Sequence, residues 1–130
     1  MTYFKKYNVT SRDLSESVPN EATIAYNAYL TDTAAREPFE VGLTATLPCS
    51  WIYYEVAAEM KKTQVEDNPY QEWIDAYGST PWEESETKAF VDLIEYYMKN
   101  ADEELREKME QAYKKAVGFE YMFWDTVYRQ

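Results

Sequence analysis

The sequence contains no histidine and only one cysteine among its 130 residues. Zinc, haem and non-haem iron sites are built mainly from histidine and cysteine side chains, so we expect no metal site and no cofactor of these kinds. A single cysteine cannot form a disulfide within the chain. The sequence also lacks an N-terminal apolar signal region and any long apolar run, which predicts a cytoplasmic protein that does not enter a membrane.

Basic residues are few: 13 lysines and arginines stand against 24 aspartates and glutamates, which gives a formal net charge of -11. This charge repels nucleic-acid phosphates and anionic membrane surfaces, so we expect neither as a partner. Glutamate-rich solvent faces explain the acidity more simply than a cationic ligand does. The charge therefore excludes partners more clearly than it identifies one.

Glycine and proline are also scarce, at 3 and 5 residues, and no segment alternates apolar and polar residues as a strand does. The apolar periodicity predicts an all-α fold in a single domain, residues 1–130. Capping residues, prolines and glycines place the main helices at 21–35, at 38–62, from Asn68 to Gly78, from Pro81 to Asn100 and from Asp102 to the end.

Three local features refine this pattern. Residues 1–8 have the spacing of a helix tail, and residues 10–19 predict a loop with one helical turn at most. Residues 79–80, a serine and a threonine, supply the expected cap of the helix that begins at Pro81. Pro48 lies inside the predicted helix 38–62, where it removes a backbone donor, so we expect an interruption and a kink.

Cys49, the only thiol, lies just beyond that proline, and Tyr53 follows one helical turn later on the same face. A phenol could therefore reach the sulfur or the group that the sulfur attacks. The residues alone favour structural burial of Cys49, because cysteine is among the most buried residue types. Tyr26 and Tyr77 are further candidates, although each taken alone is more often a core tyrosine than a ligand contact.

Glu120 lies in the aromatic segment 118–124. Gly118 would permit the close approach of another element, and burial among rings would raise the pKa of Glu120 and suit it to proton transfer. Periodicity leaves a solvent-facing Glu120 equally open. Its apolar neighbours one turn later, Phe123 and Trp124, favour burial. From the residues we infer a ring-lined pocket without a named substrate.

Three blocks of this sequence resemble the TenA (thiaminase II) family of thiamin-salvage enzymes. Residues 47–55, which read LPCSWIYYE, are similar to the family's LPC-x-W-x-Y signature, and residues 68–77 and 119–129 are similar to its two later blocks in order and spacing. The similarity is weaker towards the N-terminus but extends through Tyr26. It implies a helical bundle resembling the haem-oxygenase-like fold, without haem.

The resemblance also implies an activity, the hydrolysis of an aminomethyl-pyrimidine or of thiamin to hydroxymethyl-pyrimidine, with no cofactor. By this likeness Cys49 would be the nucleophile that adds to the pyrimidine ring, and Glu120 would be the general acid and base. Tyrosines would position the ring and its amino group, and a phenylalanine would stack on the substrate or wall it: Tyr26, Tyr53, Tyr77 and Phe123.

The chain departs from the family pattern at its start. It has no counterpart of the family's first helices, which supply a pyrimidine-binding aspartate and an aromatic residue to the pocket. Exposed apolar surface is then expected, and with it a homo-oligomer or a complex with a chain that supplies those helices. A natural split protein, a degenerate member and a truncated gene would each account for the difference.

Three functions follow from these alternatives. The leading hypothesis is a thiamin-salvage hydrolase that is complete only when a second chain supplies the missing aspartate. The second is a non-catalytic pyrimidine-binding or assembly module that has kept the pocket residues. The third is a purely structural helical subunit, which would neither bind a pyrimidine nor respond to the loss of the cysteine.

Overall fold

The computed structural model describes residues 2–63 and 65–129, with the side chains described from residue 4 onward. This part of the chain contains seven α-helices, one 3₁₀ turn and no strand, which confirms the all-helical prediction. The elements are α1 (Thr2–Lys6), α2 (Ser11–Glu16), α3 (Glu21–Arg36), α4 (Phe39–Thr63), α5 (Gln71–Gly78), η1 (Trp82–Glu84), α6 (Glu86–Asn100) and α7 (Glu103–Tyr128). None of the helices within these ranges is long and apolar enough to cross a membrane.

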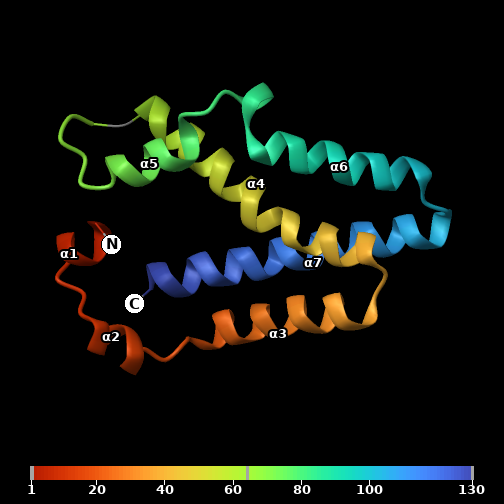
Figure 1. The fold of residues 1–130 in the computed structure, drawn as a ribbon, viewed down its shortest axis with the longest axis horizontal. Helices are drawn as coiled ribbons and strands as arrows, with labels where there is room; N and C mark the ends of the chain where they lie inside the picture. The colour runs from red at the N-terminus through yellow and green to blue at the C-terminus, as the bar shows by residue number, and fades with distance from the viewer. Residues whose placement is uncertain (1, 64, 130) are drawn as a thin grey trace.

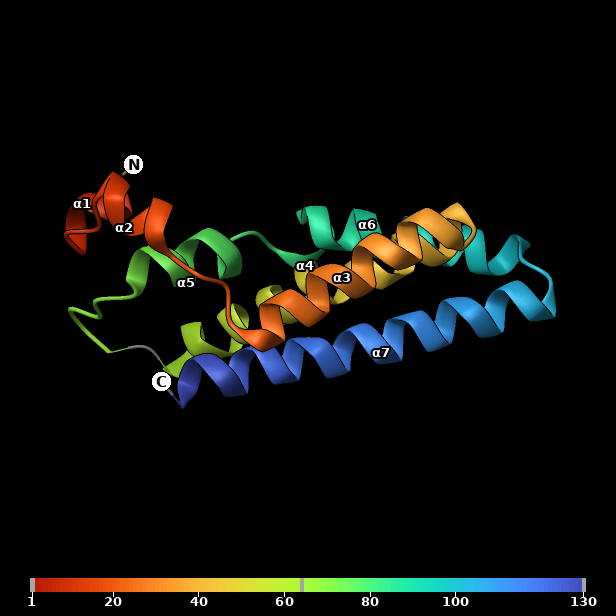
Figure 2. The ribbon, with the colours of Figure 1, turned by 90° about the horizontal axis from the view of Figure 1, so that it is seen from below.

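Helix α4 lies at the centre of the arrangement (Figure 1). It packs most extensively against α7 and then against α5, and it also contacts α3 and α6. Helices α3 and α7 run side by side, whereas α6 diverges from α7 away from the loop that joins them (Figures 1 and 2). Helices α1, α2 and α5 gather at the same end of the molecule as the last turns of α7 (Figure 2).

The hydrophobic core lies where α4, α6 and α7 meet. Its buried members come from these three helices: Val41, Ala45, Leu47, Ile94, Met109 and Ala112. Partly buried rings, among them Trp51 and Phe90, pack around it. Removing this apolar surface from water stabilises the contact of α4 with α7. The core therefore fixes the relative position of the two helices that carry Cys49 and Glu120.

The predicted helix through Pro48 is confirmed, and the predicted kink at this residue stays a prediction. Helix α4 continues through Pro48 as one helix. The proline side chain is fully buried, and α4 contacts four other helices. This packing outweighs the cost of a proline inside a helix, which is about 3 kcal/mol. Cys49 and Tyr53 therefore lie on the same continuous helix, one turn apart.

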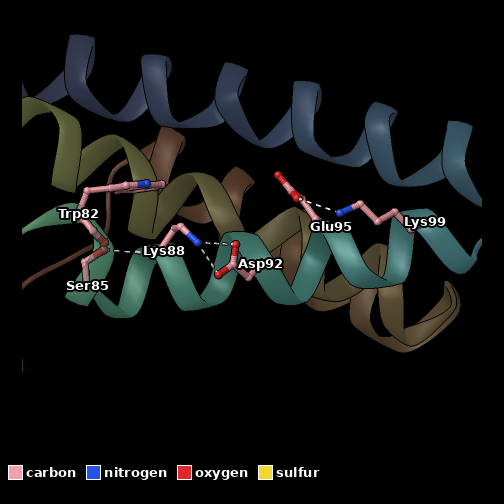
Figure 3. Close-up of polar contacts among 6 residues, drawn as sticks. All are labelled: Trp82, Ser85, Lys88, Asp92, Glu95 and Lys99. Carbon is pink, nitrogen blue, oxygen red and sulfur yellow. Dashed lines mark hydrogen bonds and ion pairs between the residues drawn. The ribbon is translucent and has the colours of Figure 1, made fainter.

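The predicted cap at residues 79–80 is also wrong. Helix α6 is capped by Ser85, whose hydroxyl accepts a hydrogen bond from the Lys88 backbone N–H at 3.0 Å and donates to the Trp82 carbonyl at 2.8 Å (Figure 3). Pro81 precedes the 3₁₀ turn, with a non-helical ψ of 146°. The chain therefore makes one more turn before α6 begins.

The remaining predicted boundaries are confirmed closely. Asn20 caps α3 by accepting a hydrogen bond from the Thr23 N–H at 2.9 Å, and Asp102 caps α7 by accepting one from the Leu105 N–H at 2.9 Å. The stretch 10–19 contains the short helix α2, which has no buried residue. Helix α1 agrees with the predicted helix tail, but Met1 and the side chain of Tyr3 lie outside the described part.

Gly78, the last residue of α5, lies directly against the backbone of α4. A Cβ atom at this position would be 2.8 Å from the Ala57 carbonyl carbon and 2.9 Å from its oxygen. Only glycine permits this approach, because neither contact atom belongs to a flexible side chain. The end of α5 is thereby held close to α4, which brings the rings of Trp73 and Tyr77 towards Tyr53.

Candidate functional site

Glu120 is the only charged side chain that is buried among the described residues, with 2% of its surface exposed. It lies on α7, and its carboxyl faces Tyr26 of α3, Cys49 of α4 and Trp124 of its own helix. Burial raises the pKa of the carboxyl above its ordinary range, and the contacts with these three groups lower it by less. The predicted burial of Glu120 is confirmed, and its carboxyl is shifted towards the neutral acid.

The Cys49 thiol is exposed, so the structural burial that the residues alone favoured is wrong. Exposure arises because Cys49 falls on a side of α4 that its neighbouring helices leave open, whereas Leu47 and Pro48 point inward. Partial burial raises the pKa of the thiol, and the charge and hydrogen bonding of Glu120 raise it further. The thiol and the carboxyl therefore share one proton more readily than they both ionise.

The Tyr26 hydroxyl and the Trp124 indole nitrogen are buried next to this pair. Neither Tyr26 Oη nor Trp124 Nε1 makes a hydrogen bond of regular geometry. Both nevertheless lie close enough to Glu120 to lower the pKa of its carboxyl. Both donors therefore lie near the carboxyl without being hydrogen-bonded to it. A small adjustment of either side chain would complete a hydrogen bond.

Tyr53 is the fourth predicted residue at this place. Partial burial, followed by the charges of Glu120 and Cys49, raises the pKa of its phenol to about 12. Its hydroxyl therefore stays protonated at neutral pH and remains a donor. The structure thus brings Tyr26, Cys49, Tyr53 and Glu120 together from three different helices.

A cluster of four rings extends from this site towards α5, and we call it the ring cluster: Tyr53, Trp73, Tyr77 and Trp124. The centroid of Tyr53 lies 5.2 Å from that of Trp124, 5.5 Å from that of Tyr77 and 6.1 Å from that of Trp73. Tilted rings at these distances attract one another beyond their burial. Tyr77 is 45% exposed and joins the site through Tyr53 rather than through Glu120.

Phe119, the residue before Glu120, sets the position of Tyr26. Its ring stacks on Tyr26 at a centroid distance of 5.4 Å and on Tyr29 at 5.1 Å. The Tyr29 hydroxyl donates a hydrogen bond to the Ala112 carbonyl at 3.2 Å. These contacts align α3 with α7 and hold the Tyr26 phenol beside Glu120.

Gly118 and Phe123 in the segment 118–124 do not make the contacts expected of a close approach or of a ring cluster. Gly118 is wrongly predicted as a point of close approach, because a Cβ atom there would meet nothing within 4 Å. Phe123, the predicted substrate wall, is half-buried one turn after Glu120 and takes no part in the ring contacts described above. Its role stays a prediction.

Sequence reasoning missed three residues of the site. Trp124 was recognised only as an apolar neighbour of Glu120, although its spacing of four residues places the indole over the carboxyl. Phe119 and Trp73 gave no signal of their own, because their contacts with α3 and α4 depend on how the helices pack. No group of three or more potential metal-ligating side chains occurs within residues 2–63 and 65–129.

The chemistry available at this place is nucleophilic and acid–base. An exposed thiol lies beside a carboxyl that is shifted towards its neutral form, so one group can attack an electrophile while the other supplies or accepts a proton. The protonated phenols of Tyr26 and Tyr53 lie beside the pair. This environment suits a flat ligand with polar edges.

Comparison with known proteins gives a match over the whole chain. The TENA/THI-4/PQQC family pattern matches residues 1–130. A protein named aminopyrimidine aminohydrolase from Halalkalibacterium halodurans is 28% identical, over 98% of this chain and 58% of the relative. A protein of the same name from Bacillus subtilis is 29% identical, over 86% of this chain and 47% of the relative.

A third relative is the thiamine biosynthesis multifunctional protein ThiED of Corynebacterium efficiens, 30% identical over 88% of this chain and 15% of its own length. The match to such a large protein falls on a small part of it. The chain spans about half the length of the first two relatives.

Proposed function

The chain belongs to the TENA/THI-4/PQQC family, and on that premise we propose that it is a thiamin-salvage hydrolase in which Cys49 and Glu120 act on an aminomethyl-pyrimidine or on thiamin. The relatives named aminopyrimidine aminohydrolase support the substrate class. The all-helical arrangement around α4 supports the haem-oxygenase-like bundle that the resemblance implies.

The observation that carries the proposal is the proximity of Cys49 and Glu120, two residues far apart in the sequence whose side chains lie close enough for each to shift the pKa of the other. An exposed thiol with no acid or base beside it would be an ordinary surface cysteine. A buried glutamate without a partner would only destabilise the fold. Their proximity supports a chemical role for each. A carboxyl that can take a proton from the thiol and return it elsewhere is a general acid and base.

In the proposed reaction, the Glu120 carboxylate takes the thiol proton as the sulfur adds to a carbon of the pyrimidine ring. The neutral Glu120 then gives that proton to a ring nitrogen, which accepts the electron pair displaced by the addition. Glu120 carries the ring-nitrogen proton to the amino group, which leaves the exocyclic methylene as ammonia; from thiamin the thiazole leaves as a neutral molecule. Water then adds to the methylene, and Glu120 carries one of its protons to the ring nitrogen. The sulfur departs as the ring is restored, and this proton returns to the thiol, which yields hydroxymethyl-pyrimidine.

Aromatic residues would hold the substrate during these steps. The phenols of Tyr26 and Tyr53 are donors beside the thiol, and Tyr77 lies next to Tyr53. We propose that they fix the ring and its amino group in one orientation, with Phe123 as a wall. Orienting a flat substrate against a nucleophile lowers the entropic cost of the reaction.

The proposal includes a partner. We propose that the active assembly is a homo-oligomer or a complex with a second chain that contributes further pocket residues. The exposed thiol of Cys49 supports this, because a nucleophile for pyrimidine chemistry needs a site from which water is largely excluded. Exposed apolar side chains near the C-terminal end of α7, among them Tyr121 and Val127, offer surface for such contacts.

The test is the release of ammonia from aminomethyl-pyrimidine by the recombinant chain, alone and together with any separately encoded chain that covers the rest of the relatives' length. The proposal predicts turnover in at least one of the two mixtures and none after Cys49→Ser. Absence of turnover in both, with the thiol intact by mass spectrometry, removes the hydrolase proposal.

A binding-only function is the second candidate, and the raised pKa of the Cys49 thiol favours it, because a protonated thiol is a poor nucleophile. A thermal-shift measurement with the pyrimidine separates the two candidates. A clear rise in melting temperature without product formation supports binding alone. A purely structural subunit would show neither.

A further inference from the structure

Trp124 is placed to act on Glu120. It follows Glu120 by one helical turn on α7, and side chains on a helix lean towards its N-terminus, so the indole lies over the carboxyl. Its ring packs against Tyr53 at 5.2 Å and edge-on against Trp73 at 6.4 Å. Rings from α4 and α5 thereby hold the indole in place.

The indole nitrogen of Trp124 is buried and makes no hydrogen bond. Leaving such a donor unpaired away from water costs free energy, so its approach to a nearby acceptor is favourable. That acceptor is the carboxyl of Glu120. The position of the indole ring and the cost of leaving its N–H unpaired therefore both favour a contact of Trp124 with the Glu120 carboxyl.

The groups that face Glu120 differ in what they can do with a proton. Cys49 on α4 and Tyr26 on α3 can both donate and accept a hydrogen bond, and each can ionise. Tyr53 can also ionise, and Glu120 affects its pKa through charge alone. The indole N–H of Trp124 only donates and does not titrate. A carboxyl oxygen of Glu120 that accepts a hydrogen bond from the indole N–H cannot at the same time point its own acidic proton at the indole.

We propose that Trp124 is a positioning residue that holds the Glu120 proton on the carboxyl oxygen facing Cys49 and Tyr26. When a small adjustment brings the indole N–H onto one oxygen, the neutral acid presents its proton on the other, where the thiol and the substrate ring would meet. The catalytic consequence rests on the proposed function, whereas the effect on the ionisation of Glu120 does not require turnover.

The test removes the N–H and keeps an aromatic ring. In Trp124→Phe the ionised form of Glu120 loses a donor, so its titration midpoint moves to higher pH by about half a unit to one unit. Carbon NMR of protein labelled at the glutamate carboxyl measures this, with the Glu120 signal assigned by its absence in Glu120→Gln. Trp73→Phe is the matched control, because it alters the same ring cluster without touching Glu120.

The result that overturns the inference is an unchanged midpoint in Trp124→Phe, or an equal shift in Trp73→Phe. If Trp124→Phe does not fold, a benzothienyl-alanine at position 124 keeps the shape of the indole without its N–H, and the same shift is expected. In an active assembly, the acid limb of kcat moves with the NMR midpoint while KM stays within about twofold of its original value. A shifted midpoint, together with no turnover either alone or with a partner chain, refutes the proposed function and leaves the role of Trp124 standing.

Discussion

Glu120 disfavours the ionisation of the Cys49 thiol, whereas hydrogen bonding by the thiol favours the ionised form of the Glu120 carboxyl. Negative charge on Glu120 raises the pKa of the thiol, and burial keeps the carboxyl towards its neutral form. A resting site of this kind holds the nucleophile in its unreactive form. Attack then depends on transfer of the thiol proton to Glu120, which a substrate placed against both groups would promote.

This coupling predicts that Glu120→Gln makes the free thiol more reactive. Glutamine carries no charge, so the Cys49 thiolate forms more easily. Alkylation by iodoacetamide at pH 7 should then be about two- to threefold faster. The gain is limited because a thiolate of lower pKa is also a weaker nucleophile. Mass spectrometry gives the rate without ambiguity, since Cys49 is the only cysteine in the sequence. An equal or slower rate would show that Glu120 does not control the thiol.

The buried carboxyl also predicts a pH-dependent stability. Its pKa is raised in the folded state, so the folded protein gains stability from the neutral acid below the ordinary value of 4.5 and loses this contribution as the pH rises through the folded pKa. The Glu120→Gln variant has no ionisable carboxyl at this position, so its stability does not fall with pH for this reason. The melting temperature of the variant relative to the original protein should therefore rise between pH 4 and pH 8.

Glu110→Gln is the control for that experiment, because Glu110 lies on the same helix but on the exposed side, paired with Lys114 at 3.4 Å. Its melting temperature relative to the original protein should change little over the same range. A difference for Glu120→Gln that stays constant with pH would contradict the burial of an ionisable carboxyl.

At the residue scale, the sequence predicted what local spacing decides. The apolar residues Phe123 and Trp124 one turn after Glu120 indicated its burial, and the structure confirms it. The exposure of Cys49 was not predictable, because it depends on which helices cover α4. General tendencies of cysteine pointed the other way.

At the scale of elements, capping chemistry predicted most helix starts. Asn20 and Asp102 each stand alone as strong caps, so the boundaries of α3 and α7 were fixed by local sequence. Several candidates compete before α6, where residues 79–80 and Ser85 can all cap a helix. The choice of Ser85 follows from the extra 3₁₀ turn after Pro81, which local propensity does not specify.

The contact of α5 with α4 predicts that Gly78→Ala destabilises the protein. The added methyl would meet the Ala57 backbone at 2.8 Å, so α5 must move away, at a cost of about 1–3 kcal/mol. Urea unfolding measures this cost. Since Trp73 lies on α5, its fluorescence should also change in the folded state.

Gly118→Ala is the matched glycine variant and has the opposite expected sign. Nothing lies within 4 Å of its added Cβ, and alanine favours a helix interior over glycine, so α7 should gain about 0.5–1 kcal/mol. Destabilisation by Gly118→Ala would mean that another element approaches α7 at this point. Equal effects of both substitutions would refute the close contact at Gly78.

At the scale of the whole molecule, the packing of α3, α4, α5 and α7 brings the thiol, the carboxyl and the ring cluster together. Composition and periodicity predicted an all-helical chain but not which helix faces meet, because many pairings bury similar apolar surface. The family resemblance added the meeting of Cys49 with Glu120 as an expectation. In the structure Glu120 lies close enough to Cys49 to raise the pKa of the thiol, in agreement with that expectation.

The proposed partner predicts a native assembly heavier than one chain. Large apolar side chains remain exposed, among them Phe39 at 66% and Tyr121 at 71%, and burying them in an interface would be favourable. Light scattering coupled to size-exclusion chromatography measures the mass, for the chain alone and with a candidate partner. A single-chain mass under both conditions would contradict the partner proposal.

The most direct test of the catalytic account is the turnover of aminomethyl-pyrimidine by the assembly that contains this chain, compared between the original protein, Cys49→Ser and Glu120→Gln. The account predicts that Cys49→Ser abolishes ammonia release and that Glu120→Gln lowers kcat by about 10²- to 10⁴-fold while pyrimidine binding persists. Unchanged turnover in either variant would contradict the pairing of Cys49 with Glu120 as the catalytic centre.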